Sequence, residues 1–123
     1  MRKLRYFTAV IAVLVGVLTL TACGSDDSAA SSSPQDTKTI DVKFEGGKVT
    51  PNGERVDVAV GQPVEFLVTA DAPGEIHVHS DPEHELEYGA GTTTLPAFKI
   101  DKPGIVAVES HALEKTIVQL EVK

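Results

Sequence analysis

The clearest structural signal in the chain lies in residues 56–68, which read VDVAVGQPVEFLV. Apolar residues alternate with polar or small ones in VDVAV, the turn residues GQP interrupt the pattern, and a second apolar-rich run, VEFLV, follows. Alternation with period two places successive side chains on opposite faces of an extended chain. The stretch therefore predicts two short strands, each with one buried face, joined by a turn at residues 61–63.

Similar segments occur on both sides of this stretch, so the pattern covers residues 38–123. Seven or eight short strands in about 86 residues predict an all-β fold, a Greek-key β-sandwich of two antiparallel sheets, because a single flat sheet would leave one apolar face exposed. No helix is clearly predicted, although residues 112–115 could form one helical turn. The predicted strands are 40–44, 56–60, 64–68, 75–79, 86–88, 92–100, 105–109 and 117–122, and the predicted core includes Phe66, Val68, Val106, Val108, Val118 and Leu120.

The N-terminus has the order of charge and hydrophobicity that is typical of an export signal. Residues 1–5 read MRKLR, residues 6–20 are mostly apolar, and the small residues Thr21 and Ala22 precede Cys23. This arrangement predicts a lipoprotein signal peptide at residues 1–22 and lipidation of Cys23, with acyl chains such as palmitate as the anchor. An uncleaved membrane anchor and an ordinary secretory signal are the alternatives.

Cleavage before Cys23 would give a protein that is lipid-anchored at the cell membrane, on its extracytoplasmic face. Residues 24–37 read GSDDSAASSSPQDT, which contains too little apolar surface to offset the entropy of ordering. The sequence thus predicts three parts: a signal peptide at 1–22, a lipidated cysteine and flexible tether at 23–37, and one domain at 38–123.

Charge and cysteine content limit the partners that the exported protein could bind. Without residues 1–22, it carries 8 basic and 18 acidic residues, a net charge of −10. This charge disfavours nucleic acid as a partner and attracts cations, including metal ions, although it could serve solubility alone. Cys23 is the only cysteine, so the domain has no disulfide and no thiolate ligand.

No pattern of catalytic residues is present. Ser80 and Ser110 each neighbour a histidine in sequence, but adjacent residues of a strand point to opposite faces, and neither serine lies in a nucleophile elbow. The sequence therefore predicts a protein that is not an enzyme.

Histidine placement is the strongest chemical signal in the domain. His77 and His79 are two residues apart on a predicted strand, so both imidazoles lie on one face about 6.6 Å apart. Glu109 and His111 repeat this spacing at the end of another strand. If the two strands meet, two or three histidines and one carboxylate could hold a metal ion, and these ligands suit Cu(II) or Zn(II) better than Ni(II).

The same residues also allow an interpretation without a metal. Burial of Ile76 and Val78 would turn His77 and His79 outward to water. His84, in the turn-like segment 81–85, is predicted to lie at the surface, and His111 could be a loop residue that hydrogen bonds to backbone.

Four segments resemble a cupredoxin-like domain of the kind found in actinobacterial lipoproteins and beside iron-uptake proteins: GQPVEF at 61–66, EIHVH at 75–79, DKPGI at 101–105 and VESH at 108–111. The resemblance implies a β-sandwich in which His77 or His79 is an early metal ligand and His111 a late one. Val108 stands at the position of the cupredoxin cysteine, and Thr116 at that of the methionine.

A type 1 copper centre needs a thiolate, so the chemistry of these residues excludes electron transfer of that kind. Two hypotheses follow. In the first, the domain binds Cu(II) through His77, His79 and His111, with help from Glu109. In the second, it is a metal-free interaction module that binds another exported protein or an envelope component.

Overall fold

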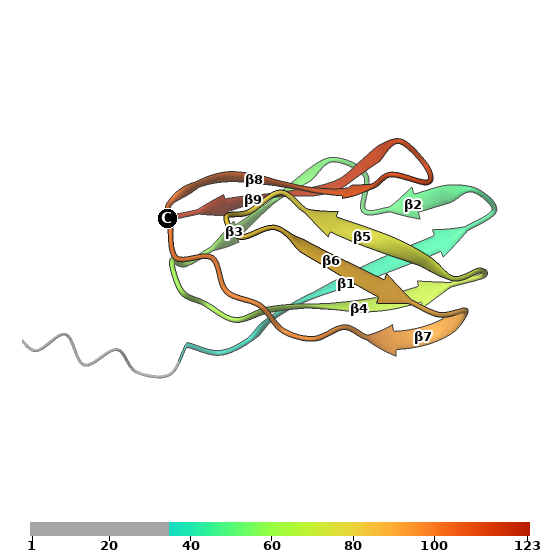
Figure 1. Ribbon diagram of the computed structural model, residues 1–123, viewed down its shortest axis with the longest axis horizontal. Coiled ribbons are helices and arrows are strands. Elements are labelled where there is room, and N and C mark those ends of the chain that lie inside the picture. The colour runs from blue at the N-terminus through green and yellow to red at the C-terminus, as the bar shows by residue number, and fades with distance from the viewer. Residues whose placement is uncertain (1–34) are drawn as a thin grey trace, which may run out of the picture. The chain divides into compact units, whose positions relative to one another are not determined.

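The computed structural model describes residues 35–123, which form a sandwich of two β-sheets (Figure 1). The predicted signal peptide, Cys23 and most of the predicted tether lie outside these residues. Within the described part of the chain, no helix is long and apolar enough to cross a membrane.

Nine strands make up the two sheets. They are β1 (Lys38–Glu45), β2 (Lys48–Thr50), β3 (Glu54–Val58), β4 (Val64–Ala70), β5 (Gly74–Val78), β6 (His84–Tyr88), β7 (Gly91–Thr94), β8 (Gly104–Ser110) and β9 (Lys115–Val122). One sheet has the order β2-β1-β4-β7 and the other the order β3-β9-β8-β5-β6.

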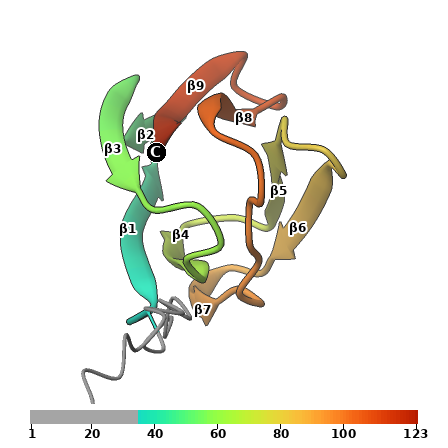
Figure 2. The same cartoon turned by 90° about the vertical axis from the view of Figure 1, so that its left-hand side faces the viewer.

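The chain passes repeatedly between the two sheets, as the end view in Figure 2 shows, which gives the predicted Greek-key sandwich. The expectation of purely antiparallel sheets was wrong. β1 pairs with β4 in parallel, and β3 pairs with β9 in parallel. In both parallel pairs the two strands are not consecutive in sequence, and the chain between them includes at least one strand of the opposite sheet, which provides the crossover that parallel pairing needs.

The core lies between the sheets, and strand alternation explains its composition. All six predicted core residues are buried, and Phe66 is fully enclosed, with its ring centroid 5.9 Å from that of Phe98. In β1 and β4, every second residue points into this core. The prediction of the core from period-two patterning is therefore confirmed.

Other details of the sequence-based strand prediction need correction. β2 was not predicted, because three residues are too few for a recognisable alternation. The predicted strand at 92–100 is the short β7, followed by irregular chain in which Phe98 forms one isolated bridge to Val64. Residues 111–114 form the turn between β8 and β9, and Lys115 already belongs to β9, so the expected helical turn at 112–115 is not present.

Two hydrogen bonds tie the start of the domain to the β3–β4 turn, one between backbone atoms and one from a side chain to the backbone. Lys38 N donates to Pro63 O at 2.7 Å, and Gln62 Nε2 donates to Asp36 O at 2.9 Å. Residues 32–123 form a compact unit that includes both contacts and every buried core side chain of the described residues. A fragment of residues 32–123 therefore contains its complete core and suits the experiments below.

Replacement of Phe66 by alanine is expected to lower the free energy of unfolding by about 3 to 5 kcal/mol, because it leaves a cavity at the centre of the sandwich. Urea denaturation of fragment 32–123 measures this change. Ile105→Ala is the control, since Ile105 is 52% exposed. Equal midpoints for the two variants would contradict the assignment of Phe66 to the core.

Candidate metal centre

The outer face of the five-stranded sheet carries the histidines, and strand alternation places them there. On β5, Ile76 and Val78 are fully buried between the sheets, so His77 points outward. On β8, Val108 and Ser110 are buried in the same way, which turns Glu109 outward. The sequence prediction that the apolar residues of β5 face the core is confirmed. The histidine side chains point outward, and this direction does not move them apart from one another.

The pairing of β5 with β8 brings the two sequence-distant histidine segments together. His77 lies opposite Glu109 in the antiparallel register, and His79 N donates to Ala107 O at 2.9 Å beyond the end of β5. The β8–β9 ladder has a bulge between Val108 and Glu109. Bulges redirect neighbouring side chains and are common beside functional sites.

His77, His79 and His111 form a compact cluster. Each can offer one ring nitrogen so that the three atoms lie within 4.8 Å of one another. The His77 and His79 rings are stacked with centroids 4.5 Å apart, and His77 Nδ1 lies 3.2 Å from His111 Nε2. The described residues therefore contain a three-histidine cluster that could hold a metal ion.

The three imidazoles differ in their access to solvent. Only 12% of the His77 side chain is exposed, compared with 36% for His79, while His111 is exposed just beyond the end of β8. His77 thus lies at the base of the cluster, and the other two rings leave an open side toward solvent. Such a site could bind an ion directly from solution.

Two carboxylates contact the ring nitrogens of the cluster. Glu109 Oε2 lies 2.9 Å from His79 Nε2, and Glu109 Oε1 accepts a hydrogen bond from Thr116 Oγ1 at 3.3 Å. Glu83 Oε2 lies 3.3 Å from His77 Nε2, and Glu83 Oε1 lies 3.8 Å from His79 Nδ1. Glu109 was expected from its spacing to His111 to take part in the site, and it lies beside His79.

Glu83 is a site residue that the sequence analysis missed. It lies in the loop between β5 and β6, where side-chain contacts restrain the chain: Ser80 Oγ donates to Pro82 O at 2.6 Å, and the Lys102 ammonium lies 2.5 Å from the Asp81 carboxylate. Lys102 lowers the pKa of Asp81 by this hydrogen bond and by its charge. No periodic pattern marks Glu83, so only the fold of this loop relates it to the histidines.

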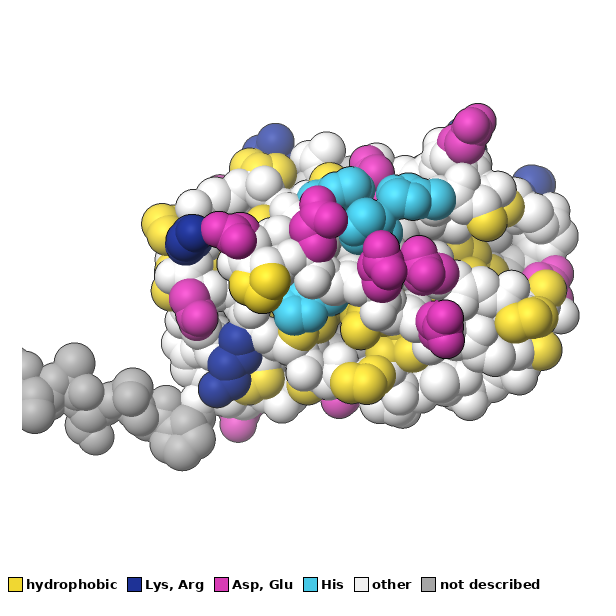
Figure 3. Space-filling view, in the orientation of Figure 1, with side chains coloured by type: hydrophobic (Ala, Val, Ile, Leu, Met, Phe, Trp, Pro, Cys, Tyr) yellow, Lys and Arg dark blue, Asp and Glu magenta, His cyan; other side chains and the backbone are white. Residues whose placement is uncertain are grey.

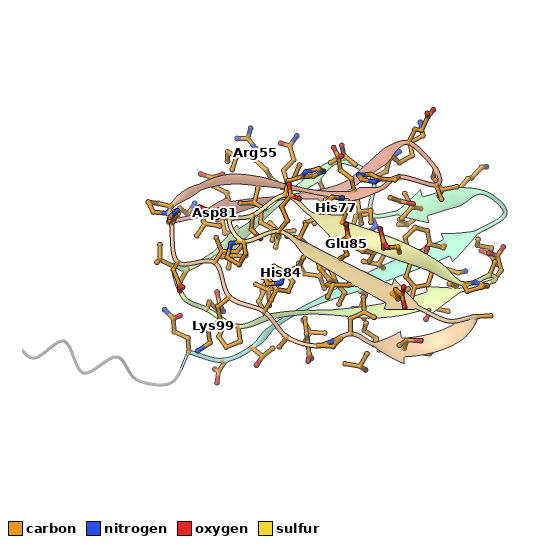
Figure 4. All side chains as sticks on the ribbon, in the orientation of Figure 1. Arg55, His77, Asp81, His84, Glu85 and Lys99 are labelled. Carbon is orange, nitrogen blue, oxygen red and sulfur yellow. The ribbon has the colours of Figure 1, made fainter. Side chains whose placement is uncertain are left out.

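His84 does not join the cluster. It begins β6 opposite Val78 and is half-buried, with its ring centroid 4.9 Å from that of Phe98. The expectation of a turn at this residue was wrong, because β6 starts at His84, and its side chain keeps part of its surface exposed. Figure 4 shows His84 well below His77.

Acidic side chains surround the cluster on the same face. Figure 3 shows the three clustered histidines with several acidic groups beside them. Glu85 lies opposite His77 on β6, as Figure 4 also shows, and the exposed Glu87 follows on the same strand. The resulting negative potential favours cations near the imidazoles.

A shallow hollow of about 520 Å³ adjoins the cluster and ends at His111. Its floor includes Tyr88, which is 8% exposed and stacks on Phe44 with ring centroids 4.8 Å apart. Gly74 also lines this hollow, and a Cβ at that position would overlap the Tyr88 hydroxyl. Burial raises the pKa of Tyr88 above 10.0, and the nearby Asp71 carboxylate adds to the effect.

No family model matches the sequence, and no curated protein matches it. Among solved structures, a multi-copper oxidase from Pediococcus acidilactici is similar, with a TM-score of 0.50, 14% identity, and coverage of 94% of this chain and 30% of the oxidase. A chain of a heme-copper terminal oxidase dimer has a TM-score of 0.46 and 16% identity over 75% of this chain and 74% of that one. A Cu(I) structure of an amicyanin mutant has a TM-score of 0.40 and 15% identity over 69% of this chain and 82% of amicyanin.

At these identities, the similarity concerns the fold alone. The chain spans less than a third of the length of the oxidase that it matches. Together with the two-sheet topology, the similarity defines the domain as an all-β sandwich with a cupredoxin-like fold. Its histidine cluster contains no cysteine or methionine.

The raised pKa of Tyr88 predicts a measurable titration. Fragment 32–123 contains a single tyrosine, since Tyr6 lies in the predicted signal peptide. The ultraviolet absorbance of phenolate should therefore report Tyr88 alone, with a midpoint above 10.0 in the folded fragment and a lower one in denaturant. Because folding favours the neutral phenol, this contribution to stability is complete below the unfolded pKa and is lost as pH rises through the folded pKa. Equal midpoints in the two states would contradict burial of Tyr88.

Proposed function

We propose that this protein is a non-enzymatic, membrane-tethered metal-binding protein that holds a divalent ion, Cu(II), through His77, His79 and His111. The observation that carries the proposal is the set of three imidazole nitrogens within 4.8 Å of one another. His77 and His79 are two residues apart in sequence, and the pairing of β5 with β8 brings His111 close to them. The acidic surroundings add a favourable potential for a cation.

The spacing of the nitrogens supports this interpretation quantitatively. Two ligands bound at about 2.0 Å to one ion are about 2.8 Å apart at a right angle and about 3.3 Å apart at a tetrahedral angle. His77 Nδ1 and His111 Nε2 are 3.2 Å apart, between these values. The distance between these two nitrogens therefore matches that of two ligands of one ion.

The ligand chemistry favours copper or zinc in a site without electron-transfer activity. Imidazole nitrogens suit Cu(II) and Zn(II), and Cu(II) binds more tightly at a given nitrogen and oxygen site. The resemblance in fold to a multi-copper oxidase adds support for copper. Since Cys23 is the only cysteine and lies in the N-terminal region, no thiolate is available for a type 1 centre.

Electron paramagnetic resonance of fragment 32–123 with one equivalent of Cu(II) tests the proposal. We expect coupling to several nitrogens and no intense thiolate-to-copper absorption band. His77→Ala and His111→Ala should each lose a nitrogen ligand and weaken binding. Acidification should also release the metal, because protonated imidazoles are not ligands.

His84→Ala is the matched control, because it removes the histidine that packs on Phe98 outside the cluster. Its Cu(II) spectrum should equal that of the unchanged fragment. If all three variants keep the original spectrum, or if Cu(II) binds no more tightly than to an unstructured histidine peptide, the metal proposal is wrong. The outer face of β5 and β8 would then be better explained as the surface of a metal-free interaction module.

The proposed location rests on the N-terminal sequence. Residues 1–22 have the charge, hydrophobicity and small residues of a lipoprotein signal, and Cys23 follows directly. Lipidation there would hold the domain at the extracytoplasmic face of the cell membrane. The short polar segment before β1 would separate the domain from the lipid surface.

Cys23→Ala is expected to abolish retention by lipid, because two or more acyl chains are needed for stable anchoring and this variant cannot accept them. Fractionation of cells that express the full chain, with detection of acyl-chain labelling, measures the effect. A Ser25→Ala variant, two residues further along, should stay lipidated. Acyl labelling that persists in the Cys23 variant would contradict this proposal.

A further inference from the structure

The contact between Glu109 and His79 determines which nitrogen of His79 is free. An ionised carboxylate can only accept a hydrogen bond, so the 2.9 Å contact requires a proton on His79 Nε2. In a neutral imidazole, the other nitrogen then carries the lone pair. This leaves Nδ1 of His79 as the nitrogen that is available to a metal ion.

The same argument applies to His77 and Glu83. His77 Nε2 lies 3.3 Å from Glu83 Oε2, while His77 Nδ1 lies 3.2 Å from His111 Nε2. If Nε2 donates to the carboxylate, Nδ1 carries the lone pair and faces His111. A metal shared by these two histidines would therefore bind Nδ1 of His77, because Nε2 is occupied by the contact with Glu83.

The exposed ring of His111 is the third ring for which a metal-binding nitrogen can be identified. Its Nε2 donates to His77 Nδ1 when no ion is bound, because His77 Nδ1 acts as the acceptor in this pair. On metal binding, the His111 proton moves to Nδ1 of the same ring, and Nε2 becomes a ligand. No net gain or loss of protons is needed at neutral imidazoles.

We infer that Glu83 and Glu109 are positioning residues that select the metal-binding nitrogens: Nδ1 of His77, Nδ1 of His79 and Nε2 of His111. This inference deepens the proposed function and rests on it for the metal-bound state. Each carboxylate orients one ring through its second nitrogen, as carboxylates behind metal-ligating histidines commonly do. Neither carboxylate needs to bind the ion itself.

The contacts of Glu109 and Glu83 fit the role of residues that orient the histidine rings. Glu109 is fixed from its other oxygen by Thr116, and 33% of its side chain is exposed. Glu83 lies on the restrained β5–β6 loop with one oxygen 3.3 Å from His77 Nε2. Its other oxygen is 3.8 Å from His79 Nδ1, too far for a hydrogen bond, so this nitrogen needs no proton.

Long-range proton–nitrogen NMR of ¹⁵N-histidine fragment 32–123 tests the inference in two states. Without metal, His77 and His79 are expected in the form that is protonated at Nε2. With one equivalent of Zn(II), which is diamagnetic, the shifts should assign coordination to Nδ1 of His77, Nδ1 of His79 and Nε2 of His111. Coordination through Nε2 of His77 or His79, or Nδ1-protonated rings in the metal-free fragment, would overturn it.

Glutamine variants provide the second measurement. Glu109→Gln should remove the tautomer preference of His79 alone, and Glu83→Gln that of His77. Each should weaken Cu(II) binding by about 10- to 100-fold, measured by competition with a chelator, while the nitrogen ligands are kept. Glu87→Gln is the control: it removes the same charge from the same face without a contact to the rings, and its effect should stay within about fivefold.

The outcomes separate the inference from the proposed function. If no metal binds but His77 and His79 keep the Nε2-protonated form, and each glutamine variant abolishes it in its own histidine, the metal proposal fails, the selection of metal-binding nitrogens fails with it, and only the orientation of each ring by its carboxylate is supported. If Cu(II) binds but Glu83→Gln and Glu109→Gln weaken it no more than Glu87→Gln, the positioning role is wrong while the metal site stands.

Discussion

The burial of alternate side chains on β5 and β8 is the constraint on which the candidate site depends. Ile76 and Val78 face the core from β5, while Val108 and Ser110 face it from β8. With these side chains enclosed between the sheets, the intervening residues have to point outward. A shift of either strand by one residue would bury its charged or imidazole side chains, so the stability of the core and the exposure of the site share one register.

The site differs in character from a buried cofactor pocket. Its ligands lie on the outer face of a sheet, with His77 shielded and His79 and His111 open to solvent. An exposed set of nitrogen donors near carboxylates has a local potential that favours cations, so the cluster could bind a metal ion from solution. The rigid sheet contributes His77, and the flanking loops contribute Glu83 and His111.

Strand pairing and loop contacts together organise the cluster. The pairing of β5 with β8 sets His77 opposite Glu109, and His111 follows directly after the end of β8. Glu83 approaches from the opposite side on the β5–β6 loop. The cluster therefore combines three chain segments, and a change in any one would alter the distances between the ring nitrogens.

The sequence by itself determined which side chains share a face, because alternation along a strand is a local property of the backbone. It therefore predicted the sandwich, the buried Phe66 and the common direction of His77 and His79. Only the tertiary structure decided that β8 lies beside β5, that β1 and β4 run parallel, and that Glu83 reaches His77. These features depend on how distant segments bury apolar surface against one another, and no local pattern encodes that choice.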